Sequence, residues 1–415
     1  MKKSFATLCL LAAILTGTAL AQQGPVPKGI PHLDHVFLIM MENHGYAQIL
    51  NNPDAPFLNQ YAKSANLATN YFAIAHPSLT NYLEVVGGSN FGVLDDNSPD
   101  WHSTTCITNL ASRVASTEAT SAPICPITGI GTDAATPLID ETNETQGPPG
   151  DIEIDGIHSY PAKSSTRGIT IADQLVTAGK TWKSYQEDLP ATGADTINYS
   201  DGLFTNNTDF TQISPRFSSG NVVQQYAVKH NPFAYFQAVQ EGSDPNHSLR
   251  NIVAFDGDTG LYADLRTGRV PNFAFISPNQ CHDQHGRGNA GPFCQFDYHN
   301  NGTQKGLNPA LILTGDLAVQ NLVTAIHNSP AWTRGHNAII VVWDENDYTV
   351  APITNQVVLI VDTNYGFHSL ESGQYYTHFS LLRSLEAGFG LPCLNHACDA
   401  SSSVMSDLFA APAHR

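Results

Sequence analysis

Apolar runs that alternate with amphipathic stretches dominate the pattern of hydrophobic and polar positions along this chain. Runs rich in Val, Ile and Phe predict buried strands at His35–Met41, Asn251–Phe255, Asn272–Ile276, Ala338–Trp343 and Val357–Val361. Apolar residues at helical spacing predict helices at Ala55–Ala65, Ile171–Ala178, Ala310–His327 and Thr377–Gly388, the last with Thr377 as its N-cap. Strands that alternate with helices predict an α/β fold, with a mostly parallel central sheet and helices on both faces.

Two of the predicted strands end abruptly on polar residues. The strand that begins at His35 is followed by Glu42 and Asn43, and the strand that ends at Trp343 is followed by Asp344 and Glu345. The carboxyl ends of parallel strands form the ligand crevice of an open α/β sheet, and hard divalent ions prefer oxygen ligands from separate elements. A solvated strand end would explain either pair alone. The repetition of the arrangement favours a shared cation site.

A hydroxyl group stands just before a further predicted helix, in the segment His76-Pro77-Ser78-Leu79-Thr80-Asn81-Tyr82. A serine at this place would be activated by the positive end of the helix dipole, near backbone N–H groups that can hold a phosphate. Alternatively, Ser78 or Thr80 is only an N-cap, which is far commoner than a nucleophile. The local sequence by itself favours the cap.

Other candidate residues lie in polar segments after predicted strands or at element ends. The loop Pro278–His285 is dense in polar side chains, of which Asp283 and His285 are candidates and His282 is the one most easily explained as a bystander. His378 is either a helix-start residue or a residue of the same crevice. Lys229-His230 supplies positive charge for a phosphate or forms a plain surface turn.

The N-terminal residues and the cysteines of the chain indicate export. Lys2 and Lys3, a following apolar stretch and Ala19-Leu20-Ala21 predict a signal peptide over residues 1–21, cleaved after Ala21. We expect no later run long and apolar enough to span a membrane. Outside the signal an even number of cysteines remains, which favours disulfides, and proximity suggests Cys106–Cys125, Cys281–Cys294 and Cys393–Cys398 among the formally possible pairings.

The formal net charge of −18 argues against a nucleic-acid partner, because such proteins neutralise phosphates with Lys and Arg. A bound cation could still reverse the field locally and allow phosphate binding. The length after residue 21 allows two domains or one large α/β domain with insertions. Low periodicity and many Thr, Ser, Gly and Pro residues predict an irregular insertion at about 89–167, over the site.

In chain order, the motifs MENH, HPSLTNYL, SPNQCHD, VVWDEND and THFSLLRSLE resemble those of the bacterial phosphoesterase family that contains secreted acid phosphatases and phospholipases C, in the alkaline phosphatase superfamily. The resemblance runs from about His35 to Leu391. It implies an alkaline-phosphatase-like three-layer sandwich and a single catalytic domain over residues 22–415. Thr80 stands where the family usually has proline, and His282 stands where asparagine is usual.

The resemblance also implies roles for individual residues. It implies one divalent metal ion bound by Glu42, Asn43, Asp344 and Glu345, and the oxygen ligands favour calcium, magnesium or manganese over zinc. Ser78 matches the family nucleophile. The catalytic residues expected on this basis are Ser78, Asp283, His285 and His378, and the expected substrate-binding residues are His44, His76, Asn81, Lys229 and His230.

The function implied is that of a secreted or periplasmic acid phosphatase that hydrolyses small phosphate monoesters through a phosphoserine. The alternative within the same chemistry is a phospholipase C-type phosphodiesterase acting on phospholipids. A binding protein on a degenerate hydrolase fold would be a third class. That class is disfavoured because the expected nucleophile and ligands are all present.

Overall fold

The computed structural model describes residues 23–93, 95–101, 106, 124–128, 160, 166–189, 197, 225–287, 290–346 and 354–409. The predicted signal peptide and most of the predicted insertion lie outside these residues. Both therefore stay predictions.

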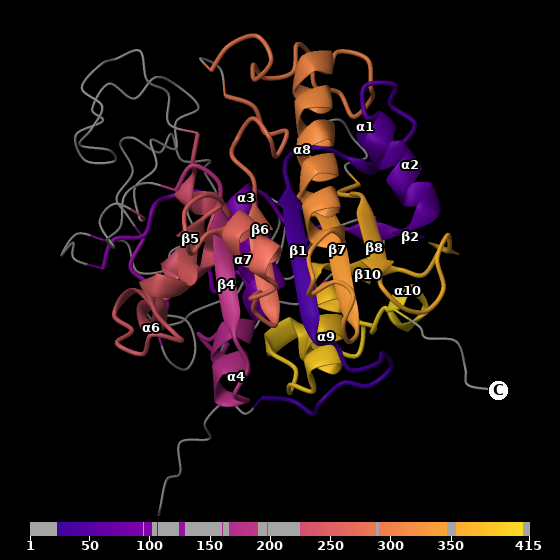
Figure 1. Ribbon diagram of the computed structural model, residues 1–415. Helices are drawn as coiled ribbons and strands as arrows, with labels where there is room; N and C mark the ends of the chain where they lie inside the picture. Colours follow the sequence, from indigo (N-terminus) through magenta and orange to yellow (C-terminus); the bar gives the residue numbers. More distant parts are fainter. Residues whose placement is uncertain are drawn as a thin grey trace, which may run out of the picture.

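Within the described residues, an eight-stranded sheet runs through the middle of the molecule in the order β5-β4-β6-β1-β7-β8-β2-β9 (Figure 1). Strand β8 runs antiparallel to its neighbours β7 and β2, and the other neighbouring strands pair in parallel. The strands are β1 (His35–Met41), β2 (Asn66–Ala68), β4 (Trp182–Gln186), β5 (Ile252–Ala254), β6 (Phe273–Ser277), β7 (Asn337–Trp343), β8 (Leu359–Thr363) and β9 (Glu371–Ser372). A small parallel pair joins β3 (Tyr71–Phe72) to β10 (Tyr376–Thr377).

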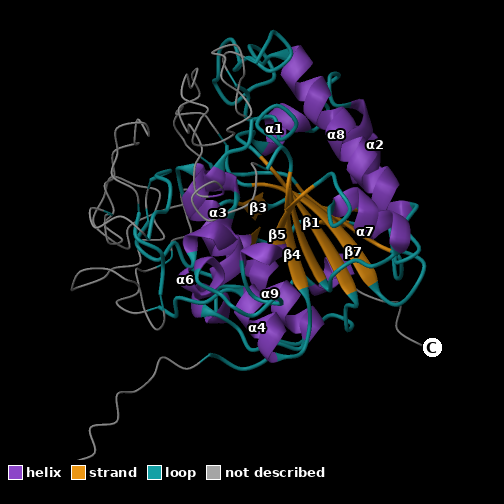
Figure 2. Cartoon of the chain, turned by 60° about the vertical axis from the view of Figure 1, so that its left-hand side comes forward, coloured by secondary structure: helices purple, strands orange, loops and turns teal. Residues whose placement is uncertain are grey.

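Helices cover both faces of the large sheet, as Figure 2 shows. Helices α2 (Pro56–Ser64), α7 (Leu261–Thr267) and α8 (Pro309–His327) lie on one face, and α3 (Ser78–Gly87), α4 (Ile171–Thr177) and α9 (His378–Phe389) lie on the other. The shorter helices are α1 (Tyr46–Ile49), α6 (Gln237–Gln240), α10 (Ser406–Phe409), η2 (Val228–His230), η3 (Pro232–Tyr235), η4 (Leu249–Asn251) and η5 (Asn395–Cys398). The structure confirms the predicted three-layer α/β architecture.

Burial on both sides explains why β1 and β7 are continuous apolar runs. Residues Val36–Met41 of β1 and all residues of β7 have no exposed surface, as expected for central parallel strands that lie between two helical layers. Each fully buried Ile, Leu or Val side chain contributes roughly 1.5–3 kcal/mol relative to an exposed one. The sheet centre is therefore a rigid base for the polar residues that follow β1 and β7.

The chain differs from the sequence prediction in several elements. Strand β4 was not predicted, because Lys183, Ser184 and Gln186 interrupt its apolar pattern. Those polar side chains are accommodated by specific partners, such as Asp264 for Lys183 at 2.5 Å. By length and composition α8 could cross a membrane, contrary to the expectation for this part of the chain, but its apolar side packs in the helical layer with α2 and α7. The three predicted disulfides are all present.

Candidate active site

The polar residues that follow β1 and β7 meet at one edge of the sheet. The two strands pair in parallel register from His35 with Asn337 to Met41 with Trp343, so the next residues emerge side by side. The backbone N–H of Asn43 donates to Asp344 Oδ1 at 3.0 Å. Asn43 has φ 53°, a left-handed conformation that asparagine adopts more readily than most residues. All four predicted metal ligands, Glu42, Asn43, Asp344 and Glu345, are buried here.

Ser78 lies at the first position of α3 and points into the carboxylates. Its Oγ lies 3.1 Å from Glu42 Oε2 and 3.3 Å from Glu345 Oε1, so its one proton can be donated to either carboxylate. The N-cap of α3 is Pro77, so the structure contradicts the capping interpretation of Ser78. The Thr80 hydroxyl donates to the Pro77 carbonyl at 2.6 Å. Of the two candidate hydroxyl groups, only that of Ser78 contacts the carboxylate cluster.

Asp96 supplies the cap that Pro77 cannot give. Its Oδ1 accepts the backbone N–H of Leu79 at 3.1 Å, and its Oδ2 pairs with Lys229 Nζ at 2.9 Å. Lys229 Nζ also lies 3.5 Å from Ser78 Oγ. Sequence reasoning missed Asp96, because it lies in the low-periodicity stretch that was interpreted as an insertion, and no local pattern distinguishes it from the neighbouring acidic residue.

A buried histidine links two carboxylates behind Ser78. His230 lies 2.9 Å from Glu42 Oε1 through Nε2 and 3.1 Å from Asp283 Oδ2 through Nδ1, and its ring stacks on Tyr82. His285 accepts a hydrogen bond from Lys229 Nζ at 3.3 Å and donates through Nδ1 to the Gly286 carbonyl. The structure thus brings Lys229, His230, Asp283 and His285 together around Ser78.

The electrostatics follow from burying so many acidic groups at one point. Burial alone would raise the pKa of Glu42, but His230, His285 and Lys229 hold it well below its ordinary value. Burial, with the carboxylates of Glu42 and Glu345, raises the pKa of Asp344. Burial also raises the pKa of Glu345 to about 7, despite the attraction of His76. Uncompensated carboxylates of this kind are costly, and a bound cation would remove the cost.

The histidines of the site divide into two kinds. Burial lowers the pKa of His230, yet the two carboxylates that it contacts outweigh this and raise the value to about 9. Burial and the neighbouring ammonium group of Lys229 lower the pKa of His285 well below its ordinary value. His285 is therefore neutral at neutral pH, which agrees with its accepting a hydrogen bond from Lys229.

Two buried oxygens in the cluster indicate where a cation fits. Asn43 Oδ1 and Asp344 Oδ2 have no hydrogen-bond partner among the described residues. Such orphaned acceptors beside further carboxylates suit a hard divalent ion. Glu42, His230 and His285 also converge, with ligand atoms within 4.8 Å of one another. Both nitrogens of His230 already face carboxylates, so the oxygen set is the better fit, and Glu42 belongs to both groups.

The remaining predicted site residues lie around the cluster and contact its members. His378 donates through Nε2 to the Asp344 carbonyl at 2.7 Å, and its Nδ1 accepts from the Tyr71 hydroxyl at 2.8 Å. Asn81 donates to Glu345 Oε2 at 3.2 Å. His76 Nδ1 lies 2.7 Å from the same oxygen.

His44 turns toward a different part of the chain. Its Nδ1 contacts the Glu42 carbonyl, and its Nε2 contacts Asp297 Oδ2, both at 3.0 Å. His44 thereby joins the segment that follows β1 to the loop that contains Asp297.

An open cavity of about 300 Å³ gives access to Ser78. Its polar lining comes from Asn43, Ser78, Asp96, Lys229, His285 and Glu345, and its apolar lining comes from Pro77 and Phe296. Phe296 was also missed by sequence reasoning, because a single aromatic residue in a polar loop carries no recognisable pattern.

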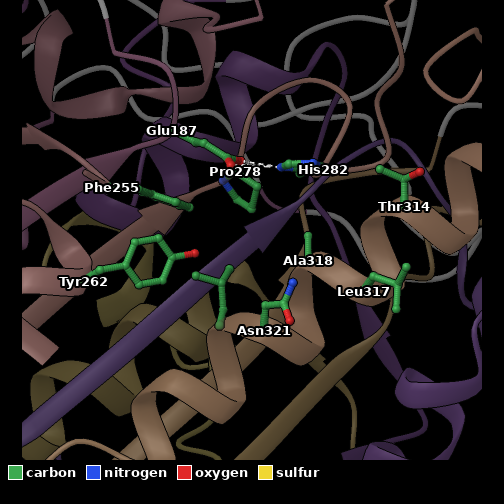
Figure 3. A pocket seen from close by; sticks show the side chains of 10 residues that line it. Glu187, Phe255, Tyr262, Pro278, His282, Thr314, Leu317, Ala318 and Asn321 are labelled. Carbon is green, nitrogen blue, oxygen red and sulfur yellow. Dashed lines mark hydrogen bonds and ion pairs between the residues drawn. The ribbon is translucent and has the colours of Figure 1, made fainter. Parts of the chain in front are cut away.

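His282 does not line this cavity, which agrees with the interpretation that it takes no part in the chemistry at Ser78. Its Nδ1 pairs with Glu187 at 2.8 Å, and both residues line a separate pocket with Tyr262, Leu317 and Asn321 (Figure 3). The adjacent residue Asp283 faces the opposite way, into the cluster around Ser78.

The chain is similar in sequence to phosphatases of known name. The chain is 23% identical over 406 residues to a phosphatidylinositol-3-phosphatase of Mycobacterium tuberculosis, covering 96% of this chain and 92% of that protein. It is 22% identical to an acid phosphatase of Aspergillus fumigatus, covering 86% of this chain and 55% of that protein. The chain thus spans about half the length of that fungal relative.

The solved structure of a protein in the alkaline phosphatase superfamily from Vibrio parahaemolyticus matches with a TM-score of 0.45 and 12% identity, covering 90% of this chain and 69% of that one. The fold is assigned from the strand order of this chain and does not depend on that match. The model of the Phosphoesterase family matches residues 48–392, which include Ser78, Asp283, Asp344 and His378. The chain therefore belongs to the Phosphoesterase family.

Proposed function

We propose that this phosphoric ester hydrolase is a phosphomonoesterase of the acid phosphatase type, with Ser78 as its nucleophile. The observation that carries the proposal is the placement of the Ser78 hydroxyl between two buried carboxylates, with Lys229 Nζ at 3.5 Å. A serine surrounded by acidic groups and one ammonium group suits attack on an anionic phosphoryl group once a cation compensates the acids.

The residues expected to hold one divalent ion are Glu42, Asn43, Asp344 and Glu345. When bound, the ion would lower the pKa of the Ser78 hydroxyl and neutralise charge on the phosphoryl oxygens. His378 and Asn81 hold Asp344 and Glu345 in place from behind, so we assign positioning roles to both. His378 has both nitrogens engaged and no exposed surface, so we assign proton transfer to other residues.

Ser78 Oγ would attack phosphorus in line, forming the Oγ–P bond as the bond to the leaving oxygen breaks. The proton of Ser78 passes to a carboxylate that already accepts its hydrogen bond. Lys229 contacts the transferring phosphoryl group, and His76 protonates the leaving oxygen. Water then cleaves the phosphoserine from the side that the leaving group vacates, which releases phosphate and regenerates the hydroxyl.

Both similar proteins described above bear names of enzymes that remove phosphate from monoesters. These names support the monoesterase over the phospholipase C-type phosphodiesterase. The disulfides favour an oxidising compartment, and we propose that the protein is exported.

The test is hydrolysis of an aryl phosphate monoester and of the matching aryl phosphocholine diester, across acidic to alkaline pH. We expect the monoester to be the better substrate, and a chelator to abolish turnover until a divalent ion is added back. Preference for the diester would replace the proposal with the phosphodiesterase. Absence of turnover with either ester, with several divalent ions present, would contradict the enzymatic assignment of this site.

A further inference from the structure

The cavity above Ser78 has a polar floor and an apolar rim. Its rim contains Phe296, whose side chain is 39% exposed, and the partly exposed Pro77. The remaining lining residues carry carboxylate, amide, hydroxyl, imidazole or ammonium groups. A phosphoryl group held at Ser78 and Lys229 would direct its leaving group outward, past these two apolar side chains.

Phe296 is held in place from both sides along the chain. Two residues before it, Cys294 forms a disulfide with Cys281 in the loop that carries Asp283. Immediately after it, Asp297 contacts His44 at 3.0 Å and accepts the backbone N–H of Asn308 at 2.8 Å. The aromatic ring is therefore already held in place before a ligand binds, so binding does not carry the entropic cost of ordering it.

The ring also packs on the backbone of the site itself. A Cβ placed at Gly286 would lie 3.2 Å from Phe296 Cδ1, which shows how closely the ring approaches that glycine. The rings of Phe296 and His285 form an edge-on pair with centroids 6.2 Å apart. The position of Phe296 is thus fixed relative to His285 and, through the cavity, to Ser78.

We propose that Phe296, with Pro77, forms a subsite for the leaving group that prefers an aromatic ring, so that the substrates of the site are phosphate monoesters of aryl alcohols. This inference rests on the proposed function of the same cavity. Ring pairs contribute binding affinity beyond that of area burial, and a preorganised ring does so at little entropic cost. A small polar alkyl leaving group would leave the apolar rim exposed to water.

The experiment compares competitive inhibition by phenylphosphonate and methylphosphonate, which share one head group and differ only in the ring. We expect Phe296→Ala to raise the ratio of the phenyl to the methyl inhibition constant about fivefold. Phe296→Leu keeps apolar bulk without the ring and should give an intermediate ratio. Tyr298→Ala is the matched control, because Tyr298 lies in the same loop, is 70% exposed and does not line the cavity.

An unchanged ratio in folded Phe296→Ala protein would overturn the subsite, as would an equal change in Tyr298→Ala protein. Binding of the wild type to phosphatidylcholine vesicles, lost equally in both variants, would also overturn it, because the loop would then be a membrane-contacting surface. Failure of the proposed function looks different: the wild type would hydrolyse neither phenyl phosphate nor glycerol phosphate with metal added, whatever the phosphonate ratio.

Discussion

At the scale of single residues, the site depends on side chains whose partners come from distant parts of the chain. Ser78 contacts Glu42 and Glu345, which are separated from it by 36 and 267 positions. The Ser78 hydroxyl is therefore positioned by two strand ends and by α3. Loss of that hydroxyl should lower the catalytic rate strongly while changing the stability of the fold little.

We expect Ser78→Ala to lower kcat by at least about a thousandfold, because removal of an enzyme's nucleophile typically costs this much or more. The thermal midpoint should stay close to that of the wild type. The measurement is steady-state hydrolysis of an aryl monoester beside a thermal scan. Thr80→Ser serves as the control, since the Thr80 hydroxyl only donates to Pro77. Retained turnover in the alanine variant would remove Ser78 from the mechanism.

Asp96 performs two separable roles, which two substitutions can distinguish. Asp96→Asn keeps an oxygen for the Leu79 N–H but removes the negative charge next to Lys229. We expect inorganic phosphate to inhibit this variant about tenfold more strongly, because the ammonium group is no longer neutralised. Asp96→Ala should also lose the cap and about 1 kcal/mol of stability. Weaker phosphate inhibition in the asparagine variant would show that the pair orients Lys229 instead of neutralising it.

At the scale of elements, α9 shows how a helix can support the site while carrying a buried acid at its other end. His378 at its first position holds the Asp344 carbonyl, whereas Glu386 near its end accepts the Leu394 N–H at 2.8 Å. Burial raises the pKa of Glu386 well above its ordinary value, with only partial opposition from the Leu394 N–H and Arg383. The folded protein therefore keeps this carboxyl protonated to a higher pH than the unfolded chain does.

This raised pKa has a defined consequence for stability against pH. The stabilisation by neutral Glu386 is fully present below the pKa of the unfolded chain and is lost as pH rises toward the folded pKa. Glu386→Gln, which keeps the acceptor, should therefore gain stability over the wild type as pH increases above about 5. Urea unfolding at acidic and neutral pH measures this. The control is Glu241→Gln at an exposed position, and a gain that does not depend on pH would contradict the argument.

At the scale of the whole molecule, the charge opposes the compact state. The formal net charge is −18, so acidic side chains repel one another across the surface. Without a bound cation, the buried carboxylates of the site add to this electrostatic repulsion. Raising the salt concentration shortens the Debye length from about 30 Å at 0.01 M to about 8 Å at 0.15 M. The global repulsion should therefore be sensitive to salt, whereas the buried pairs should not.

We expect the thermal midpoint of the metal-loaded protein to rise with sodium chloride over this range. The comparison with potassium chloride at the same concentrations separates screening from ion-specific binding, since both salts screen equally. A flat or falling midpoint would mean that favourable surface pairs outweigh the net repulsion.

The sequence by itself determined the layer architecture, and it predicted many of the residues that meet around Ser78. An almost entirely apolar run such as that of β1 is typical of a central strand covered on both faces, so Glu42 and Asn43 could be placed at a sheet edge from sequence alone. The short loops between paired cysteines likewise allowed the disulfides to be predicted. These features depend on local patterns or short separations, which a sequence records directly.

Only the tertiary structure decided which side chains converge. Strand β4 and the antiparallel direction of β8 depend on partner strands elsewhere in the sheet. Asp96 and Phe296 line the cavity from loops whose sequences have no hydrophobic periodicity. The same is true of His44, whose Nε2 contacts Asp297, and of His378, whose Nδ1 contacts Tyr71. The physical reason is that hydrogen bonds and ion pairs are satisfied by whichever group is close in space, and proximity between distant segments is set by packing of the whole chain.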